Sequence, residues 1–414
     1  MRRAPRLWRW LWRAVVAAVA LPVLAGVAWL AFLGRPPAPP PLPPPLEPDN
    51  VERAGWPSLT SAGPPGFGAC IRALAIDGGG MRGIIPALIL DRIEQRTGKP
   101  VATHFDLIVG TSTGSILALG LTRPSDADAR KPAFTAREIV QLFKDNASRI
   151  FPTDFALLRS IQQIFRPKYR AQEIEAVFER YFGDVQLFEA VTAVAVPAYD
   201  IQNGRRIWFG EGGHAGLLMK DIVRGATAVP TYFPPVRLAV QKHEVQSGYV
   251  TLVDGALFAN NPAQDALAFA QKMRPKEDPS LMLVSVGTGR SERKYSFEST
   301  WGWGTLGWID PLLEIALSDP AVEFQTRRLA ALSSAAYFRF QPNLGDALLP
   351  LDASSPRAID HLTTAAERYL EEPKARRDLD TLVSELELPR SSRCKPIGKP
   401  YERRVGPRKR PGGG

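Results

Sequence analysis

The apolar positions of the chain fall into short strand-like runs, each followed by a glycine-rich turn and a helical pattern. Arg72–Ile76 predicts a buried strand, and residues 84–97 carry apolar side chains at helical spacing. Phe105–Val109 predicts a second strand, which is followed by a helix that includes Ile116–Leu119. Two strand, turn and helix units in succession indicate a βαβ series, so we expect an α/β fold.

Capping residues mark further helix starts. Thr135 and Glu138 have the spacing of a capping box. Pro262 and Pro356 stand where the first residue of a helix tolerates proline. The stretch of about 340 residues between the N-terminal spacer and the C-terminal tail fits one large α/β domain.

The second strand ends in the pentapeptide Gly110-Thr111-Ser112-Thr113-Gly114. In a G-x-S-x-G turn between a strand and a helix, the serine is pushed out of the backbone as a nucleophile. Gly110 and Gly114 fit because this turn is too tight for larger side chains. The alternative is a plain loop, since a chain with 34 glycines can match the pattern by chance.

The first glycine-rich turn, Asp77 to Gly83, allows three interpretations. Gly78, Gly80 and Gly83 satisfy the dinucleotide pattern G-x-G-x-x-G, but the next strand ends without the carboxylate that would hold a ribose. A phosphate-binding loop would need a Lys-Ser or Lys-Thr pair, which does not follow these glycines. The third interpretation is an oxyanion hole, in which backbone N–H groups converge on a small anion at a helix N-terminus. The nearby serine turn favours the third.

A serine nucleophile needs a base, and Asp254 is the best candidate. It follows the predicted strand Tyr249–Val253, and loops at the carboxyl ends of strands gather along one crevice of an α/β sheet. An ordinary helix cap is the alternative role. The chain holds four histidines, none in a sequence context that places it beside Ser112: His104, His214, His243 and His361.

With these motifs together, the chain resembles the patatin-like phospholipases, a family of serine lipid acyl hydrolases. Asp77 to Gly83 is similar to the family's D-G-G-G-x-R-G oxyanion turn, Gly110 to Gly114 to its serine turn, and Asp254-Gly255-Ala256 to its aspartate motif. Weaker similarities are found at 226–235, at 285–289 and around Trp308. The resemblance covers residues from about 72 to about 370, roughly three quarters of the chain.

The resemblance implies a three-layer α/β fold with a mainly parallel central sheet, and a Ser-Asp dyad that hydrolyses acyl esters of glycerolipids without a cofactor or metal. Ser112 would be the nucleophile and Asp254 the base, in an environment that raises the pKa of its carboxyl. Arg82 would either anchor the glycine turn or face a lipid phosphate. The oxyanion region would comprise Gly78, Gly79, Gly80, Arg82, Gly83 and Thr113.

The N-terminus predicts a membrane anchor. The 21 residues from Ala14 to Gly34 carry no charge, which is about the length that spans a bilayer. Five arginines precede this run, so the positive-inside rule puts Met1 in the cytoplasm and the enzyme across the membrane. Cleavage as a signal peptide after Gly26-Val27-Ala28 is the alternative, which would give a secreted enzyme. We expect a single-pass protein of a bacterial inner membrane with a periplasmic catalytic domain.

Charge is concentrated at the two ends of the chain. The net charge is +10, of which the first thirteen residues carry +5 and residues 390–414 carry +8, so the remainder has a net charge of −3. A nucleic-acid partner is therefore not expected, while the basic tail either binds anionic lipids or only aids solubility. The predicted organisation is a cytoplasmic basic segment (1–13), a transmembrane helix (14–34), a proline-rich linker (35–55), a catalytic domain (70–389) and a disordered tail (390–414).

Two further features leave alternatives open. Cys70 and Cys394 are too few for a disulfide framework or a metal site. The tryptophan- and glycine-rich segment 301–309 is either a packed cap over the crevice or a loop that enters the lipid interface.

The function that the sequence favours is a membrane-anchored lipid acyl hydrolase. The alternatives are an acyltransferase and a catalytically idle lipid-binding protein on the same fold.

Overall fold

The structure, a computed structural model, describes most of residues 70–394 and a few positions between 16 and 42. The internal gaps are 154–165, 211–213, 215, 241–246, 274–279, 293, 305–306, 309–310, 313, 316–319, 346–349 and 390–391. The predicted segment 1–13 and most of the predicted segments 14–34, 35–55 and 390–414 lie outside the described residues. Among the residues that are described, no helix is long and apolar enough to cross a membrane.

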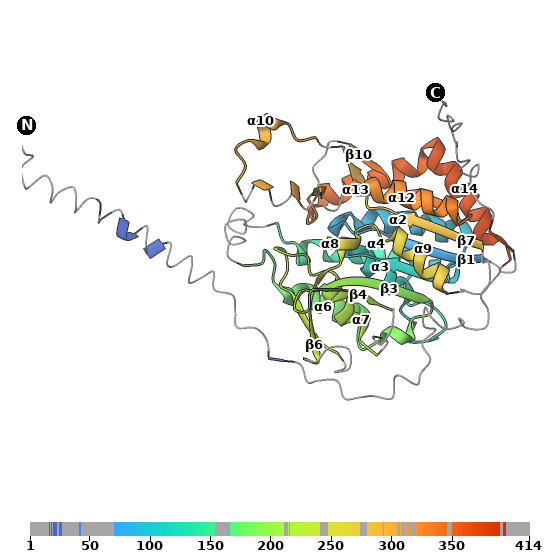
Figure 1. The fold of residues 1–414 in the computed structure, drawn as a ribbon, viewed down its shortest axis with the longest axis horizontal. Helices are drawn as coiled ribbons and strands as arrows, with labels where there is room; N and C mark the ends of the chain where they lie inside the picture. The colour runs from blue at the N-terminus through green and yellow to red at the C-terminus, as the bar shows by residue number, and fades with distance from the viewer. Residues whose placement is uncertain are drawn as a thin grey trace, which may run out of the picture.

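Within the described residues, eight strands form one mixed sheet (Figure 1). Five strands pair in parallel in the spatial order β3-β2-β1-β7-β9. They are β1 (Cys70–Ile76), β2 (Leu107–Gly110), β3 (Ala193–Asp200), β7 (Ser280–Val286) and β9 (Ala336–Phe340). β8 (Arg290–Ser291) and β10 (Asn343–Gly345) form a separate parallel pair.

The remaining three strands make the sheet mixed, although most of its strands pair in parallel as expected. β4 (Arg205–Phe209) and β6 (Tyr249–Asp254) both pair antiparallel with β3, and β5 (Val236–Ala239) pairs antiparallel with β6. The physical reason for β4 is the turn 201–204, because so short a connection permits only antiparallel pairing. Ala198–Asp200 of β3 pair with β4 and with β6 at the same time, so these two antiparallel strands lie on opposite edges of β3.

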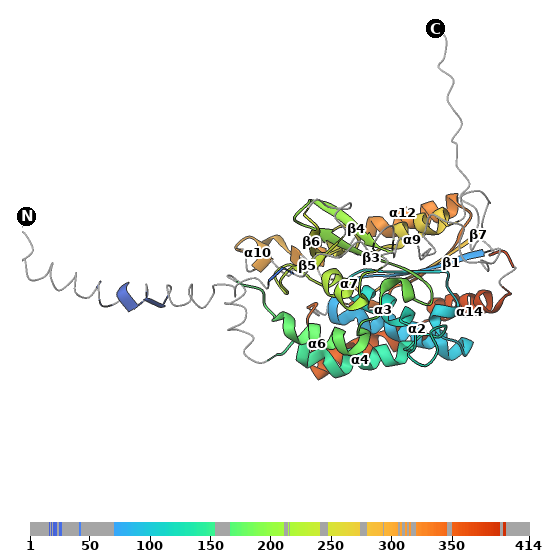
Figure 2. The same ribbon diagram turned by 90° about the horizontal axis from the view of Figure 1, so that it is seen from below.

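Helices cover both faces of the sheet, which gives three layers (Figure 2). Ile71, Ala73 and Ala75 of β1 pack against α9 (Ala263–Lys272), on the face that also carries α12 (Pro320–Leu332). Leu74 and Ile76 alternate to the opposite face, as the two-residue period of a strand requires. The larger layer on that face contains α2 (Ile84–Thr97), α3 (Thr113–Thr122), α4 (Ala136–Ile150), α6 (Ala171–Phe182), α7 (Met219–Ala226), α13 (Pro356–Glu371) and α14 (Pro373–Glu387).

Several predicted helix boundaries are confirmed. The predicted helix 84–97 is α2, and Thr135 and Glu138 form the capping box of α4. Pro356 is the first residue of α13. Pro262 instead precedes α9, where its carbonyl accepts the first helical hydrogen bond from Ala266. Short helical turns complete the domain: η2 (Gly80–Gly83), η3 (Val101–Thr103), η4 (Leu187–Glu189), α8 (Ala256–Ala259) and α10 (Phe297–Thr300).

The two ends of the described domain meet at the start of β1. Cys70 and Cys394, 324 residues apart, form a disulfide, a bond that our sequence analysis did not predict. Beside it, the buried Arg72 guanidinium donates hydrogen bonds to the carbonyls of Glu385, Leu386 and Leu388 at the end of α14. The end of α14 is thus held to the first strand by hydrogen bonds, and the chain beyond α14 is joined to that strand by the disulfide.

Candidate active site

Ser112 lies in a strained turn between β2 and α3. Its φ is 53°, a left-handed value that costs a non-glycine residue about 1–3 kcal/mol. A Cβ on Gly110 would collide with the carbonyl of Gly114, and a Cβ on Gly114 would collide with the carbonyl of Ile76. Close backbone approach therefore accounts for both glycines of the motif. The turn presents Ser112 at the N-terminus of α3.

Asp254 reaches Ser112 from an antiparallel strand. The register of β6 places Asp254 opposite Ala198 of β3, whereas Val109 of β2 lies opposite Ala195. β3 extends beyond the end of β2, so the carboxyl end of β6 arrives beside the Ser112 turn although β6 runs in the opposite direction. The Ser112 and Asp254 side chains are brought together, as predicted. The prediction assumed two parallel strands that end at the same edge of the sheet, whereas β6 is antiparallel to β3.

The environment of Asp254 makes its carboxyl a weaker acid than an ordinary aspartate carboxyl. The residue is 1% exposed, and burial raises its pKa to about 7, against the opposing effects of the Ser112 hydroxyl and the Ala256 N–H. The Ala256 N–H donates to Oδ1 at 2.8 Å. Oδ2 has no partner with full hydrogen-bond geometry in the described part of the chain, so the Ser112 contact is looser than a complete hydrogen bond. Gly255 allows this arrangement because a Cβ there would collide with the Pro197 carbonyl.

The glycine turn 78–83 passes along the other side of Ser112. A Cβ on Gly78 would lie 3.2 Å from the Cβ of Ser112, so these two residues are in contact. The Gly78 N–H is already engaged, because it donates to the carbonyl of Asn260 at 2.9 Å. Three other backbone N–H groups donate to no described residue: those of Gly79, Gly80 and Thr113.

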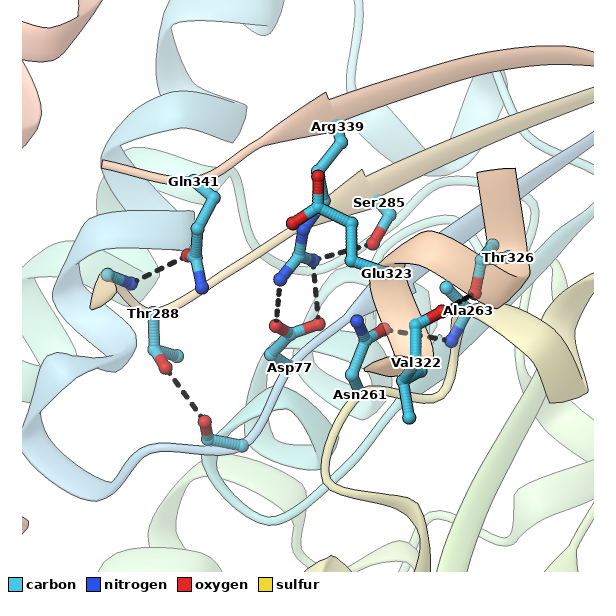
Figure 3. Close-up of polar contacts among 12 residues, drawn as sticks. Asp77, Asn261, Ala263, Ser285, Thr288, Val322, Glu323, Thr326, Arg339 and Gln341 are labelled. Atoms are coloured by element: carbon cyan, nitrogen blue, oxygen red, sulfur yellow. Dashed lines mark hydrogen bonds and ion pairs between the residues drawn. The ribbon is translucent and has the colours of Figure 1, made fainter. Parts of the chain in front are cut away.

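A buried ion pair that our sequence analysis missed anchors this turn (Figure 3). Arg339 of β9 donates to Asp77 Oδ1 at 2.9 Å and to Oδ2 at 2.5 Å, and both side chains are 5% exposed. Burial acts to lower the pKa of Arg339, but the charge and the hydrogen bonds of Asp77, with smaller effects of Tyr337 and Glu323, together outweigh it and raise the pKa. Thr288 also holds the turn, through a hydrogen bond to the Gly78 carbonyl at 2.8 Å. The sequence signal that could have revealed this pair is a charged residue, Arg339, within the otherwise apolar strand Ala336–Phe340.

Arg82 folds back onto its own turn. Its Nε donates to the Gly79 carbonyl at 3.4 Å, and the residue is 7% exposed. Burial lowers the pKa of Arg82, while the charge of Glu314 opposes this effect. Of the two predicted roles, the contact supports anchoring of the turn. A Cβ on Gly83 would collide with Thr113 Oγ1, so Gly83 lets the starts of α2 and α3 approach each other.

A second segment closes over the glycine turn from the C-terminal part of the chain. The Leu351 carbonyl accepts a hydrogen bond from the Met81 N–H at 2.7 Å. Asp352 accepts hydrogen bonds from Lys168 Nζ at 2.6 Å and from Tyr169 Oη at 2.5 Å. The turn is thus clamped between β9 on one side and Leu351 on the other.

An apolar cavity of about 640 Å³, counted with its open mouth, adjoins Ser112. Phe143 of α4 and Phe178 of α6 contribute to its walls, together with Ile116 of α3 and Tyr232. Ser112, Thr113 and Gly80 lie along the same cavity. Such a lining suits an acyl chain, because it offers apolar surface with a few polar groups close to the nucleophile.

The described histidines lie away from the cavity beside Ser112, and one histidine falls outside the described residues. His104 Nε2 contacts Thr97 Oγ1 at 2.9 Å, and the ring of His214 packs edge-on to Phe209. His361 belongs to α13, and His243 falls in a gap of the structure. Among the described histidines, none lines the cavity beside Ser112. No group of three His, Cys, Asp or Glu side chains within the described residues could hold a metal ion.

Comparison with known proteins identifies the family. Residues 74–267 match the family described as patatin-like phospholipase. A relative from Solanum tuberosum, Probable inactive patatin-3-Kuras 1, is 30% identical over 276 residues, which cover 60% of this chain and 71% of that protein. The chain belongs to the patatin-like phospholipase family.

Longer matches exist among other members of the patatin-like phospholipase family. Patatin-like protein 2 of Arabidopsis thaliana is 29% identical over 362 residues, covering 78% of this chain and 88% of its own length. Patatin-T5 of Solanum tuberosum is 29% identical over 347 residues, covering 76% and 87%. The family therefore includes a relative that is named as inactive as well as relatives that are not.

Proposed function

We propose that this chain is a lipid acyl hydrolase of the phospholipase A or lysophospholipase type that uses Ser112 and Asp254 as a catalytic dyad. One observation carries the proposal: the buried Asp254 carboxyl, whose pKa is raised to about 7, adjoins Ser112 at an apolar cavity. A carboxyl of ordinary acidity would be a poor base for a hydroxyl, whereas one that titrates near neutral pH can accept and return a proton.

The first half of the reaction forms an acyl-enzyme. Asp254 takes the proton of the Ser112 hydroxyl as Oγ attacks the ester carbonyl carbon. The carbonyl oxygen becomes an oxyanion, which the N–H groups of Gly79, Gly80 and Thr113, unengaged among the described residues, would bind. One such donor is worth about 3 kcal/mol of barrier. The protonated Asp254 then gives its proton to the departing alcohol, which leaves as the deacylated lipid.

The second half repeats the same proton transfers with water. Asp254 takes a proton from a water molecule, whose oxygen attacks the acyl-enzyme carbonyl carbon. The same N–H groups bind the second oxyanion, and collapse of this intermediate returns the proton to Ser112 Oγ and releases a fatty acid. The apolar cavity would hold the acyl chain during both halves, leaving the head group outside.

We also propose that the enzyme is anchored in the inner membrane with its catalytic domain in the periplasm. The uncharged run 14–34 with its preceding arginines supports this orientation. The Cys70–Cys394 disulfide supports it independently, because disulfides persist in oxidising compartments. A reporter that is active only outside the cytoplasm, fused after Gly414, should be active. An inactive reporter, together with activity of a cytoplasmic reporter at the same site, would overturn the orientation.

Fatty-acid release from phospholipid vesicles tests the proposed activity. The full chain should release free fatty acid, and Ser112→Ala should lower the rate by at least about a thousandfold. An acyltransferase would instead transfer the chain to an added alcohol and leave little free acid. An idle lipid-binding protein would bind vesicles without either product, and both of these results would contradict the proposal.

A further inference from the structure

A group of exposed apolar side chains lies on the segment between β8 and α12. Phe297 is 67% exposed and Trp301 is 78% exposed, and their rings contact each other with centroids 5.0 Å apart. Leu312 and Ile315 on the same segment are 55% and 54% exposed. We call these four residues the apolar patch. Large apolar side chains left in water on one segment indicate a surface that binds something.

The segment is folded beneath the patch. Ser296 caps α10 through its hydroxyl, which accepts a hydrogen bond from the Ser299 N–H at 3.2 Å. The Tyr295 hydroxyl donates to Glu314 at 2.8 Å, so the two ends of the segment are tied together. Trp303 packs edge-on to Tyr295 and also to Trp308. Three aromatic rings therefore form the inner side, while Phe297 and Trp301 project outward.

The patch lies at the edge of the sheet that carries the candidate active site. The segment continues from the carboxyl end of β7, which is parallel to β1, and the glycine turn follows the carboxyl end of β1. Glu314 is close enough to Arg82 of that turn for its charge to act on the guanidinium. Figures 1 and 2 both show α10 at the margin of the body, remote from α9 and α14. A flat surface against this margin would meet the edge where Ser112 lies.

We propose that the apolar patch docks onto a phospholipid bilayer, inserting Phe297 and Trp301 into the head-group region so that lipid reaches Ser112 from the membrane. This inference rests on the proposed function, which makes lipid the substrate. The chain that precedes Cys70 supports a bilayer as the occupant: 69 residues include the uncharged run 14–34, after which 35 residues lead to the domain. Tryptophan and phenylalanine, with glycine, serine and threonine around them, are the composition of interfacial segments.

Depth-dependent quenching in the full chain tests the docking directly. Trp301→Cys, labelled with an environment-sensitive fluorophore, should brighten severalfold with phosphatidylcholine and phosphatidylglycerol vesicles and should be quenched by nitroxide-labelled lipid. Lys99→Cys is the matched control, because Lys99 is exposed and lies one helix length, about 21 Å, from the glycine turn. The control should respond to neither. No response at position 301, or equal responses at both positions, would overturn the proposal.

Rates of hydrolysis of vesicles and of a water-soluble ester, measured in two double variants, separate membrane docking from the chemical reaction. Phe297→Ser with Trp301→Ser should lower hydrolysis of vesicles at least tenfold and leave hydrolysis of a water-soluble butyrate ester unchanged. The matched control, Phe324→Ser with Leu332→Ser on α12, removes side chains of similar exposure, 68% and 65%, and should change neither rate. Equal losses in both variants, or a patch that mediates self-association in gel filtration, would contradict docking. If the unaltered enzyme hydrolyses neither substrate, the proposed function fails, and the quenching result still decides the docking.

Discussion

Arg339 and Asp77, 262 residues apart, form a buried two-pronged ion pair that connects the last strand of the parallel sheet to the glycine turn beside Ser112. Removing one member of such a pair leaves an uncompensated charge in the interior. Arg339→Met should therefore lower the free energy of unfolding by about 3–5 kcal/mol and disrupt the turn. Chemical denaturation measures the loss.

The neighbouring helix α12 provides the matched control for that substitution. Arg327 pairs with Glu323 at 2.9 Å, but its side chain is 58% exposed. Arg327→Met should cost less than about 1 kcal/mol, because solvent screens an exposed pair. Equal stability changes in the two variants would show that burial of the Asp77 pair does not have the effect inferred here.

The backbone of Gly80 gives a second prediction. Gly80 has a φ of 58°, and a Cβ there would collide with the Leu351 carbonyl that closes over the turn. Gly80→Ala should lower turnover by about a hundredfold or more, because the turn would shift and misdirect its N–H groups. Gly98→Ala is the control, since Gly98 has a φ of 66° with nothing within 4 Å of the added Cβ.

The control should show only the backbone strain, about 1–2 kcal/mol in stability, with turnover unchanged. Measuring kcat together with thermal unfolding separates the two effects. If Gly80→Ala hydrolysed esters at the normal rate but lost binding of a nucleotide, the dinucleotide interpretation of the glycine turn would replace the oxyanion hole.

The raised pKa of Asp254 sets the pH dependence. Because the ionised carboxylate is the base, kcat/KM should rise with pH with a midpoint near 7. The free energy of unfolding changes with pH in the opposite direction. The Asp254 carboxyl keeps its proton in the folded state up to about pH 7, whereas in the unfolded chain it loses the proton near its ordinary pKa of 3.8. Stability should therefore fall as pH rises from about 4 to about 7. Asp254→Asn should lack this fall, and an identical pH profile in both proteins would contradict the assigned pKa.

Sequence patterns predicted the local parts of this site well. The strand at 72–76, the helix at 84–97 and the capping box at Thr135 depend on neighbouring residues, so their signals lie within a few positions. The antiparallel course of β6 could not be read in the same way, because an apolar run has no direction. Arg339 and Leu351 reach the glycine turn across more than 250 residues, and only the tertiary fold reveals such contacts.

The disulfide is the clearest case of a missed long-range contact, and it yields its own prediction. Closing a loop of this length typically stabilises a domain by about 2–5 kcal/mol. Cys394→Ser should lower Tm accordingly, and a reductant should lower the Tm of the unaltered protein to the same value. The Cys394→Ser protein should not respond to the reductant. A Tm that is insensitive to both changes would mean that the bond does not hold the C-terminal helix in place.

The measurement that tests the central claim most directly is the rate of hydrolysis of a soluble acyl ester by Asp254→Asn, compared with Ser112→Ala and the four single His→Ala variants. A dyad without histidine predicts that the Asp254 and Ser112 variants both fold and both lose at least about a thousandfold in kcat/KM, while each histidine variant keeps nearly full activity. A histidine variant that loses as much as Ser112→Ala, or an Asp254→Asn enzyme that remains active, would contradict the account.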